Sequence, residues 1–256
     1  VHNTCSVMVK MPGMDVATAW KATLELQEHF VEVFAEYGGN IDLEAEKVYH
    51  PYLLWDIKKR YCGRKFDDPK DLSCYTLDVA GLEIKRTDAT QLAKDIQELL
   101  LKTIMPMDDL EKKIDIQTTR PQILERLQAF CEKLIRDEFP IDKFFKSATT
   151  KSISAYKKAP PVAVQVANKH NKRIRDGVME GEIIPVGERA TFVEIYKGRR
   201  ERKKLSVVKR AEDPEFVEDF NKQNKHNKIK IDRVAYLNTV ATMVEELVVY
   251  HAPDIH

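Results

Sequence analysis

The stretch YLLWDIKKRYCG, residues 52–63, places an apolar run directly before three consecutive cations. Side chains alternate between the two faces of a strand, so this pattern predicts a buried strand whose end emerges onto a polar surface. At that end Lys58, Lys59 and Arg60 can bind an anion, and Tyr61 can stack or form a hydrogen bond. A solvated strand end is the alternative interpretation of these cations.

Two further motifs flank this stretch and favour the anion site. LEAEKVYHPYLL, residues 43–54, leads into it, and GLEIKRTD, residues 81–88, follows it. This order resembles the late palm of family B DNA polymerases, where L-E-x-E-K-x-Y leads to K-K-R-Y-x-G and then to G-x-E-x-x-R-x-D. The resemblance implies an α+β fold. Residues 1–90 would form the end of a polymerase palm, an antiparallel sheet with a helix, and residues 91–256 a mainly helical thumb with a β-hairpin.

The composition agrees with one large domain or two small ones. The chain has 256 residues, of which 43% are hydrophobic and 32% charged, enough for real cores. No apolar run approaches the roughly 20 residues that span a membrane, and we find no signal peptide, so we expect an intracellular protein without a membrane partner. Its four cysteines form no C-x-x-C pair, so neither a zinc site nor a disulfide framework is expected.

The formal net charge of +1 hides an uneven distribution. Residues 1–56 carry 3 Lys or Arg and 9 Asp or Glu, a net charge of −6, whereas residues 146–210 carry 17 and 6, a net charge of +11. Clustered cations displace counterions from a phosphate backbone, so the second segment predicts a polyanionic partner. A basic disordered tail is the alternative, which the interleaved apolar residues disfavour.

Hydrophobic periodicity and turn residues predict the elements. We expect helices from Asp15 to Gly38-Gly39 and over residues 91–104, from Pro121 to 135, 162–167 and 234–250. Strands are expected at residues 7–9, 41–46 and 81–85, with a hairpin of residues 183–186 and 191–196 around Gly187-Glu188.

The N-terminal end carries a motif related to metal binding. Asn3-Thr4-Cys5-Ser6 overlays the family's Y-G-D-T-D-S motif, whose carboxylates hold two magnesium ions for phosphoryl transfer. The resemblance therefore implies Mg2+ for a complete polymerase, with no metal bound by this chain alone. Cys5 stands where the more essential aspartate belongs, and a soft thiolate is a poor ligand for a hard cation. We therefore expect Cys5 to impair magnesium catalysis.

A second interpretation of this end is an intein junction. Val1-His2-Asn3 before Thr4 resembles the end of an intein, where an apolar residue, His and Asn precede Ser, Thr or Cys. The Asn amide would cleave the chain, His would transfer the proton, and the next hydroxyl would accept the acyl group. This interpretation favours a viral polymerase acting in the host nucleus or at a cytoplasmic replication site. A decayed aspartate at Asn3 is the alternative.

The resemblance also implies two groups of nucleic-acid-binding residues. Those of the palm would hold phosphates and probe the minor groove near the primer end: Lys58, Lys59, Arg60, Tyr61, Gly63, Lys85 and Arg86. Those of the thumb would grip the duplex product: Tyr156, Lys157, Lys158, Lys172 and Arg173. A surface salt-bridge cluster and a basic domain of unrelated role are the respective alternatives.

These observations predict the palm and thumb portion of a family B DNA polymerase. Its partners would be primer–template duplex and the N-terminal polymerase half, on another chain or removed, because the family's nucleotide-binding and exonuclease motifs are not in the sequence. We therefore expect no polymerisation by this chain alone. Two alternatives remain: a non-catalytic duplex-DNA-binding module, favoured by Cys5, and a protein-binding structural subunit without DNA affinity. The acidic row Glu25, Glu28, Glu32 and Glu36 favours the last.

Overall fold

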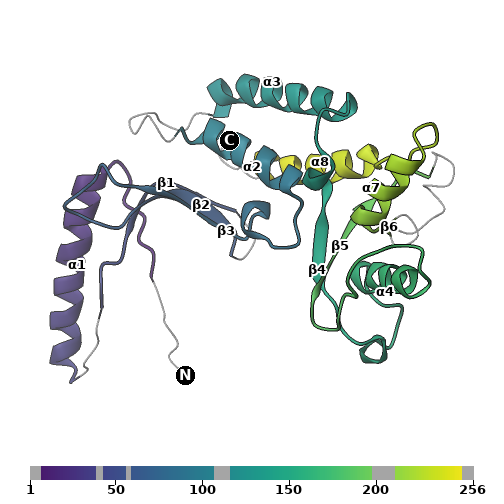
Figure 1. Cartoon of the computed structure of the whole chain (residues 1–256). Coiled ribbons are helices and arrows are strands. Elements are labelled where there is room, and N and C mark those ends of the chain that lie inside the picture. The colour runs from purple at the N-terminus through teal and green to yellow at the C-terminus, as the bar shows by residue number, and fades with distance from the viewer. Residues whose placement is uncertain (1–6, 39–42, 56–58, 107–115, 198–210, 250–256) are drawn as a thin grey trace. The chain divides into compact units, whose positions relative to one another are not determined.

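The computed structural model describes residues 7–38, 43–55, 59–106, 116–197 and 211–249. These residues form six α-helices and two three-stranded antiparallel sheets, a mixed α and β fold as predicted (Figure 1). The chain divides into two compact units. The first comprises Val1–Ala80 and Met105–Ile114, and the second comprises Gly81–Ile104 and Asp115–His256. Assigning these units to palm and thumb stays a prediction.

The first unit opens with helix α1 (Val16–Glu36). Its N-cap is Asp15, as predicted, because the carboxylate accepts a hydrogen bond from the Thr18 backbone N–H at 2.7 Å. Beyond the C-terminal end Gly38 has a φ of +73°, a value that favours glycine. Trp20 is buried, whereas Phe34 on the same helix is exposed, so only part of the helix's apolar side chains belongs to this unit's core.

The sheet of the first unit is a meander in the order β1-β2-β3. Its strands are β1 (Val48–Leu54), β2 (Tyr61–Phe66) and β3 (Thr76–Ala80). On one face of β2 the alternating residues Cys62, Arg64 and Phe66 are fully buried. The opposite face carries Tyr61, Gly63 and Lys65.

The predicted position of two of the three cations, Lys59 and Arg60, was wrong. They do not extend a buried strand, because Leu54 at the end of β1 is 66% exposed. They lie in the connection of a hairpin, which the Trp55 N–H closes by donating to the Arg60 carbonyl at 3.2 Å. Lys59 adopts a left-handed φ of 64°, as the reversal of chain direction requires. Lys58 lies outside the described residues.

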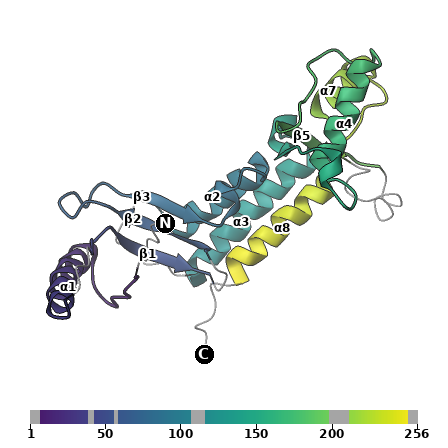
Figure 2. The same cartoon turned by 90° about the horizontal axis from the view of Figure 1, so that it is seen from below.

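The second unit contains the other five helices and the second sheet. The helices are α2 (Gln91–Ile104), α3 (Ile116–Ile135), α4 (Val162–Arg175), α7 (Pro214–Gln223) and α8 (Arg233–Val249). The strands, in order, are β4 (Lys146–Thr149), β5 (Arg189–Glu194) and β6 (Ala211–Glu212), and 3-10 turns occur at Glu83–Lys85, Ile141–Phe144 and Ile153–Ala155. Helices α2, α3 and α8 lie side by side (Figure 2).

One buried tyrosine ties α8 to the sheet of the second unit. The Tyr236 ring packs edge-on against Phe144 with the centroids 5.0 Å apart. Its hydroxyl accepts a hydrogen bond from the Glu194 N–H and donates one to the Phe144 carbonyl, both at 2.9 Å. The side chain is only 1% exposed, so both bonds are shielded from water.

Five element predictions were wrong in the described residues, besides the position of the cations. Residues 7–9 form no strand, and neither do residues 43–46, while residues 41 and 42 lie outside the described residues. Residues 81–85 include a 3-10 turn instead of a strand. Residues 183–186 form no strand, so β5 pairs with β4 and not with them. Pro121 lies inside α3, which begins five residues earlier than expected.

Side-chain amides explain three of these errors. The Gln27 Oε1 accepts from the Ala45 N–H at 2.7 Å, and the Gln97 Oε1 accepts from the Ile84 N–H at 2.9 Å. Asn171 both accepts from the Ile184 N–H and donates to the Ile184 carbonyl. Each amide satisfies backbone groups that a neighbouring strand would otherwise bind.

None of the described helices is both long and apolar enough to cross a membrane.

Candidate nucleic-acid interface

The hairpin between β1 and β2 carries two of the predicted cations, Lys59 and Arg60. Lys59 is exposed and Arg60 is half-buried at the end of the loop. Tyr61 follows as the first residue of β2 and Gly63 lies two residues further on the same face. The structure therefore brings together the described part of the predicted K-K-R-Y-x-G site.

Three tyrosines, Tyr49, Tyr52 and Tyr61, meet on this face and are called the tyrosine cluster below. The register shifts between Tyr49 and Tyr52, which face Lys65 and Gly63 respectively. This bulge inserts one residue, so two tyrosines three positions apart point to the same side. Ring centroids lie 4.8 Å apart for Tyr49 and Tyr52 and 5.5 Å apart for Tyr52 and Tyr61.

Gly63 leaves the space into which these rings pack. A Cβ at this position would lie 2.9 Å from the Pro51 carbonyl oxygen, 2.9 Å from a Tyr49 ring carbon and 3.0 Å from a Tyr52 ring carbon. Such distances are too short for any side chain, so the close approach of the rings requires glycine. The role of Gly63 in the structure is thus to admit the tyrosine cluster.

A carboxylate joins two tyrosines of the cluster. Asp78 on β3 lies directly opposite Gly63, and its Oδ2 accepts hydrogen bonds from the hydroxyls of Tyr49 at 2.5 Å and Tyr61 at 3.5 Å. Burial and the bond to Asp78 together raise the pKa of Tyr49 well above its ordinary value. The Tyr49 hydroxyl therefore keeps its proton at physiological pH and donates it to the carboxylate.

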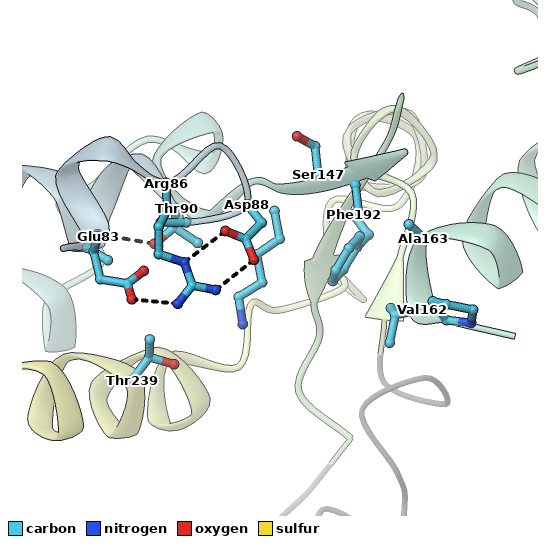
Figure 3. A pocket seen from close by; sticks show the side chains of 14 residues that line it. Glu83, Arg86, Asp88, Thr90, Ser147, Val162, Ala163, Phe192 and Thr239 are labelled. Carbon is cyan, nitrogen blue, oxygen red and sulfur yellow. Dashed lines mark hydrogen bonds and ion pairs between the residues drawn. The ribbon is translucent and has the colours of Figure 1, made fainter. Parts of the chain in front are cut away.

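The other predicted cations of the first group follow in the turn at residues 83–86. Arg86 donates to Asp88 through Nε at 3.0 Å and Nη2 at 2.8 Å, and to Glu83 through Nη1 at 3.2 Å (Figure 3). Two carboxylates neutralise this guanidinium, so Arg86 stabilises the turn. Lys85 is exposed.

An open cavity of about 450 Å3 lies beside this ion-pair cluster. Figure 3 shows Glu83, Arg86 and Asp88 on one side of it, and Val162, Ala163 and Phe192, from α4 and β5, on the other. Because its charged side is already paired internally, the cavity does not offer an anion site.

The predicted cations of the second unit divide into two classes. Lys157, Lys158 and Lys172 are exposed, and Tyr156 is half-buried beside the first two. These lysines form no ion pair with any residue in the described ranges. Arg173 instead donates to the Glu212 carboxylate at 2.8 Å and stacks on the Phe216 ring, 3.5 Å from its centroid. Arg173 thus has an internal role, and a nucleic-acid contact by it stays a prediction.

Three more cations belong to the exposed class. Among the described residues of the basic segment, Lys151, Arg175 and Lys197 are also exposed and form no ion pair there. Lys146 and Lys169, by contrast, bind internal acceptors, Glu194 at 2.7 Å and the Ala211 carbonyl at 3.0 Å. The described part of the segment, residues 146–197, therefore offers these six cations to solvent.

A buried histidine links α4 to the start of α7. The His170 Nδ1 contacts a carboxylate oxygen of Asp213, and its Nε2 lies 2.9 Å from the Glu182 carbonyl. Both partners are acceptors, so the ring donates from both nitrogens and carries a positive charge. Burial opposes that charge, but the Glu182 carbonyl and the Asp213 carboxylate outweigh it and raise the pKa of His170.

These groups could also be considered for a metal ion. Ligand atoms of His170, Asp213 and Glu215 lie within 4.8 Å of one another. Both ring nitrogens of His170 are already engaged, however, and the other oxygen of Asp213 caps α7 by accepting from the Glu215 N–H at 2.8 Å. Hydrogen bonds within the protein therefore already occupy the ligand atoms of His170 and Asp213.

The predicted metal motif at Asn3, Thr4 and Cys5 lies outside the described residues. Its side chains offer an amide, a hydroxyl and a thiol, and no carboxylate. Magnesium prefers carboxylate oxygens, so this donor set does not fit the ion that the resemblance implies.

Sequence reasoning missed Tyr49, Tyr52 and Asp78 as neighbours of the predicted site. The two tyrosines stand in the quoted motif, but a strict alternation places residues three apart on opposite faces. Only the bulge brings them together. Asp78 is far from the motif in sequence and becomes its neighbour through the pairing of β2 with β3.

The chain is similar in sequence to several known proteins. The chain is 32% identical over 206 residues to a DNA polymerase of Paramecium bursaria Chlorella virus NY2A, covering 80% of this chain and 19% of that protein. It is 30% identical over 235 residues to the DNA polymerase delta catalytic subunit of Caenorhabditis elegans, covering 92% and 19%. The chain thus spans about a fifth of the length of these curated relatives.

A solved structure shares the fold. The family B DNA polymerase from Pyrobaculum calidifontis superposes with a TM-score of 0.57 and 20% sequence identity, over 90% of this chain and 24% of that one. The model of the family described as DNA polymerase family B matches residues 3–250. Since this match covers nearly the whole sequence, the chain belongs to DNA polymerase family B.

Proposed function

We propose that this chain grips primer–template duplex as the palm and thumb portion of a family B DNA polymerase, serving template-directed nucleotidyl transfer in DNA replication. The family match over residues 3–250 carries the proposal. The first unit would be the end of the palm and the second the thumb. Because the chain spans about a fifth of its relatives, the rest of such an enzyme would supply the remaining catalytic groups.

The exposed cations support a grip on phosphates. Lys59 in the hairpin and Lys157, Lys158 and Lys172 in the second unit are exposed side chains. Contacts of this kind carry no sequence information, because every base step presents the same phosphates. A polymerase that copies any template needs contacts that do not depend on the base sequence.

The donor set at Cys5 favours a second candidate, a non-catalytic duplex-DNA-binding module. Both candidates predict duplex binding, and they differ in primer extension. If the chain is combined with the remaining parts of a related polymerase, extension that appears only in the Cys5→Asp variant would favour an enzyme that has lost activity through this residue. Extension by the unmodified chain would exclude the second candidate.

Binding to two labelled duplexes of unrelated sequence, measured by fluorescence anisotropy at low salt, tests the proposal. We expect similar Kd values for both and weaker binding by the Lys157→Gln/Lys158→Gln variant. Lys102→Gln is a matched control, because Lys102 is an exposed lysine of α2 paired with Glu98 at 2.6 Å. A strong preference for one sequence, or no binding at low salt, would contradict the proposal.

A further inference from the structure

The connection between α7 and α8 carries a group of lysines that neither predicted set of nucleic-acid-binding residues includes. Residues 224–230, called the lysine loop below, contain three lysines and one histidine, and no carboxylate. Lys225, Lys228 and Lys230 are exposed, and they form no ion pair with any residue that the structure describes. The loop therefore presents a net positive charge to solvent.

Side-chain amides and backbone bonds fix the course of the lysine loop. The Asn221 Oδ1 accepts from the Ile229 N–H at 2.7 Å, and the Asn221 Nδ2 donates to the Ile229 carbonyl at 3.0 Å. The Asn224 Nδ2 donates to the Phe220 carbonyl at 2.9 Å, and the Asn227 N–H donates to the Asn224 carbonyl at 3.1 Å. The lysines are thus held on one short, fixed loop, and a polyanion that neutralises them relieves their mutual repulsion.

An exposed tyrosine lies directly beside the end of the lysine loop. Ile195, which follows β5, forms an antiparallel bridge with Ile231, so the next pair along is Tyr196 and Lys230. The Tyr196 N–H donates to the Lys230 carbonyl at 2.7 Å. Residues opposite each other in an antiparallel pair direct their side chains to the same face. Tyr196, which is 44% exposed, therefore shares a face with Lys230.

The carboxylates next to this tyrosine along the two segments are buried. Glu194 and Asp232, the pair before it, are 5% and 0% exposed. Glu194 binds the Lys146 ammonium at 2.7 Å, and Asp232 accepts from the Ala235 N–H at 3.1 Å. Lys197, which follows the tyrosine, is exposed. In the described part of these two segments, cations and not carboxylates therefore border the aromatic surface.

We propose that Tyr196 and the lysine loop form a binding site for single-stranded nucleic acid. The lysines neutralise phosphates, and the tyrosine ring stacks on an unpaired base. Positively charged surfaces with exposed aromatic rings bind single strands in this way, because every base has a face on which a ring can stack. A duplex keeps its base faces inside its own stack, so the ring gives this site a preference for unpaired strands.

This site is additional to the proposed grip on duplex and does not depend on it. Lys157 and Lys158 follow β4, whose last residue Thr149 pairs with Arg189 at the start of β5. Tyr196 instead follows the end of β5, which has six residues. At about 3.4 Å per residue, the two ends of β5 lie roughly 20 Å apart. Figure 1 shows the connection between α7 and α8 and the connection between β4 and α4 toward opposite ends of this sheet.

Photo-crosslinking with the whole chain tests the stacking contact directly. A short oligothymidylate that carries iodouracil is bound and irradiated, and mass spectrometry of the digested protein locates the crosslink. We expect a crosslink at Tyr196, because iodouracil joins to an aromatic ring stacked on it. The variant Lys157→Gln/Lys158→Gln should keep this crosslink. No binding of the oligothymidylate, or binding without a crosslink at Tyr196, would overturn the inference.

Fluorescence anisotropy with a labelled oligothymidylate measures what each part of the site contributes. Tyr196→Ala should weaken binding at least about fivefold, the lower end of the effect of one stacked base, whereas Tyr196→Phe keeps the ring and should bind like the parent. Lys225→Gln/Lys228→Gln/Lys230→Gln should reduce the slope of log Kd against log salt by up to about 2.1, since each phosphate on a single strand contributes about 0.7. Tyr37→Ala is the matched control and should bind like the parent, because Tyr37 is 84% exposed and lies in the first unit.

Binding to duplex and to an acidic polypeptide separates this inference from its alternatives. Tyr196→Ala should leave the Kd for duplex unchanged, and equal losses for single strand and duplex would overturn the preference for unpaired bases. Polyglutamate that binds as tightly as oligothymidylate, with no effect of Tyr196→Ala on either, would overturn the inference in favour of an acidic protein partner. Should Tyr196→Ala not fold, the crosslink in the parent chain decides. A parent chain that binds oligothymidylate with the crosslink but does not bind duplex would contradict the proposed function alone.

Discussion

Replacing Gly63 by alanine should disturb the first unit in a way that the structure allows us to estimate. The added methyl group would meet a carbonyl oxygen and two ring carbons at 2.9–3.0 Å. Overpacking of this kind typically costs about 1–3 kcal/mol, and the reduced entropy of the unfolded chain returns about 0.4–1 kcal/mol. We therefore expect Gly63→Ala to lower the free energy of unfolding of the first unit by about 1–2 kcal/mol.

Urea unfolding followed by tryptophan fluorescence measures this change selectively, because both tryptophans lie in the first unit. With a slope of about 1 kcal/mol per M, the midpoint should fall by about 1–2 M. Gly177→Ala is a matched control in the second unit. There an added Cβ meets nothing within 4 Å, and a φ of +68° makes the whole cost a backbone cost.

The control should leave the fluorescence transition unchanged and shift only the transition seen by far-UV circular dichroism. An unchanged fluorescence midpoint in Gly63→Ala would refute the close packing of the rings over this residue. A large shift in both variants would instead show that the two units do not unfold separately.

Three further outcomes follow from buried polar groups and thiols. Tyr236→Phe removes the hydroxyl bound to Glu194 and Phe144 and should destabilise the second unit by about 2–4 kcal/mol in circular-dichroism melts; a change below about 1 kcal/mol would contradict both bonds. His170 has a raised pKa, so its stabilisation is complete below its ordinary value of 6.5 and is lost as pH rises through the higher folded value. The difference in urea stability between parent and His170→Gln should therefore shrink from pH 6 to pH 9, and a constant difference would exclude a charged ring. Burial raises the pKa of the Cys62 thiol to about 12, so peptide mapping after alkylation at pH 8 should find it unlabelled and exposed Cys74 labelled.

The helices were predicted well because their signals are local. Apolar periodicity located α2, α4 and α8, and Asp15 marked the start of α1 through its own side chain. Pro121 misled the prediction for α3, because proline favours the first helical position, whereas here it is the sixth residue of the helix.

The strands were predicted less well because strand pairing is not local. Alternating residues at 43–46 and 183–186 have the pattern of strands, yet Gln27 and Asn171 on helices bind their backbone groups instead. No pattern within either segment reveals a distant amide. A sequence pattern shows that a segment is extended, and only the tertiary structure decides what its backbone binds.

The residues of the candidate site likewise include neighbours in sequence, which were predicted, and a distant residue, which was not. The motif placed Lys59, Tyr61 and Gly63 close together because they are neighbours in sequence. Asp78 joined them only through the pairing of β2 with β3. Charge alone overestimated how many cations of the second group are available to a nucleic acid. Only the structure shows that Arg173 already binds the Glu212 carboxylate.

The salt dependence of duplex binding tests the central claim most directly. If exposed lysines neutralise phosphates, log Kd should change linearly with log salt, with a slope of about 0.9 for each phosphate neutralised. The triple variant Lys157→Gln/Lys158→Gln/Lys172→Gln should reduce that slope by up to about 2.7, while Lys102→Gln leaves it unchanged. A slope near zero for the parent chain, or an identical slope for parent and triple variant, would contradict a grip on the duplex by these residues.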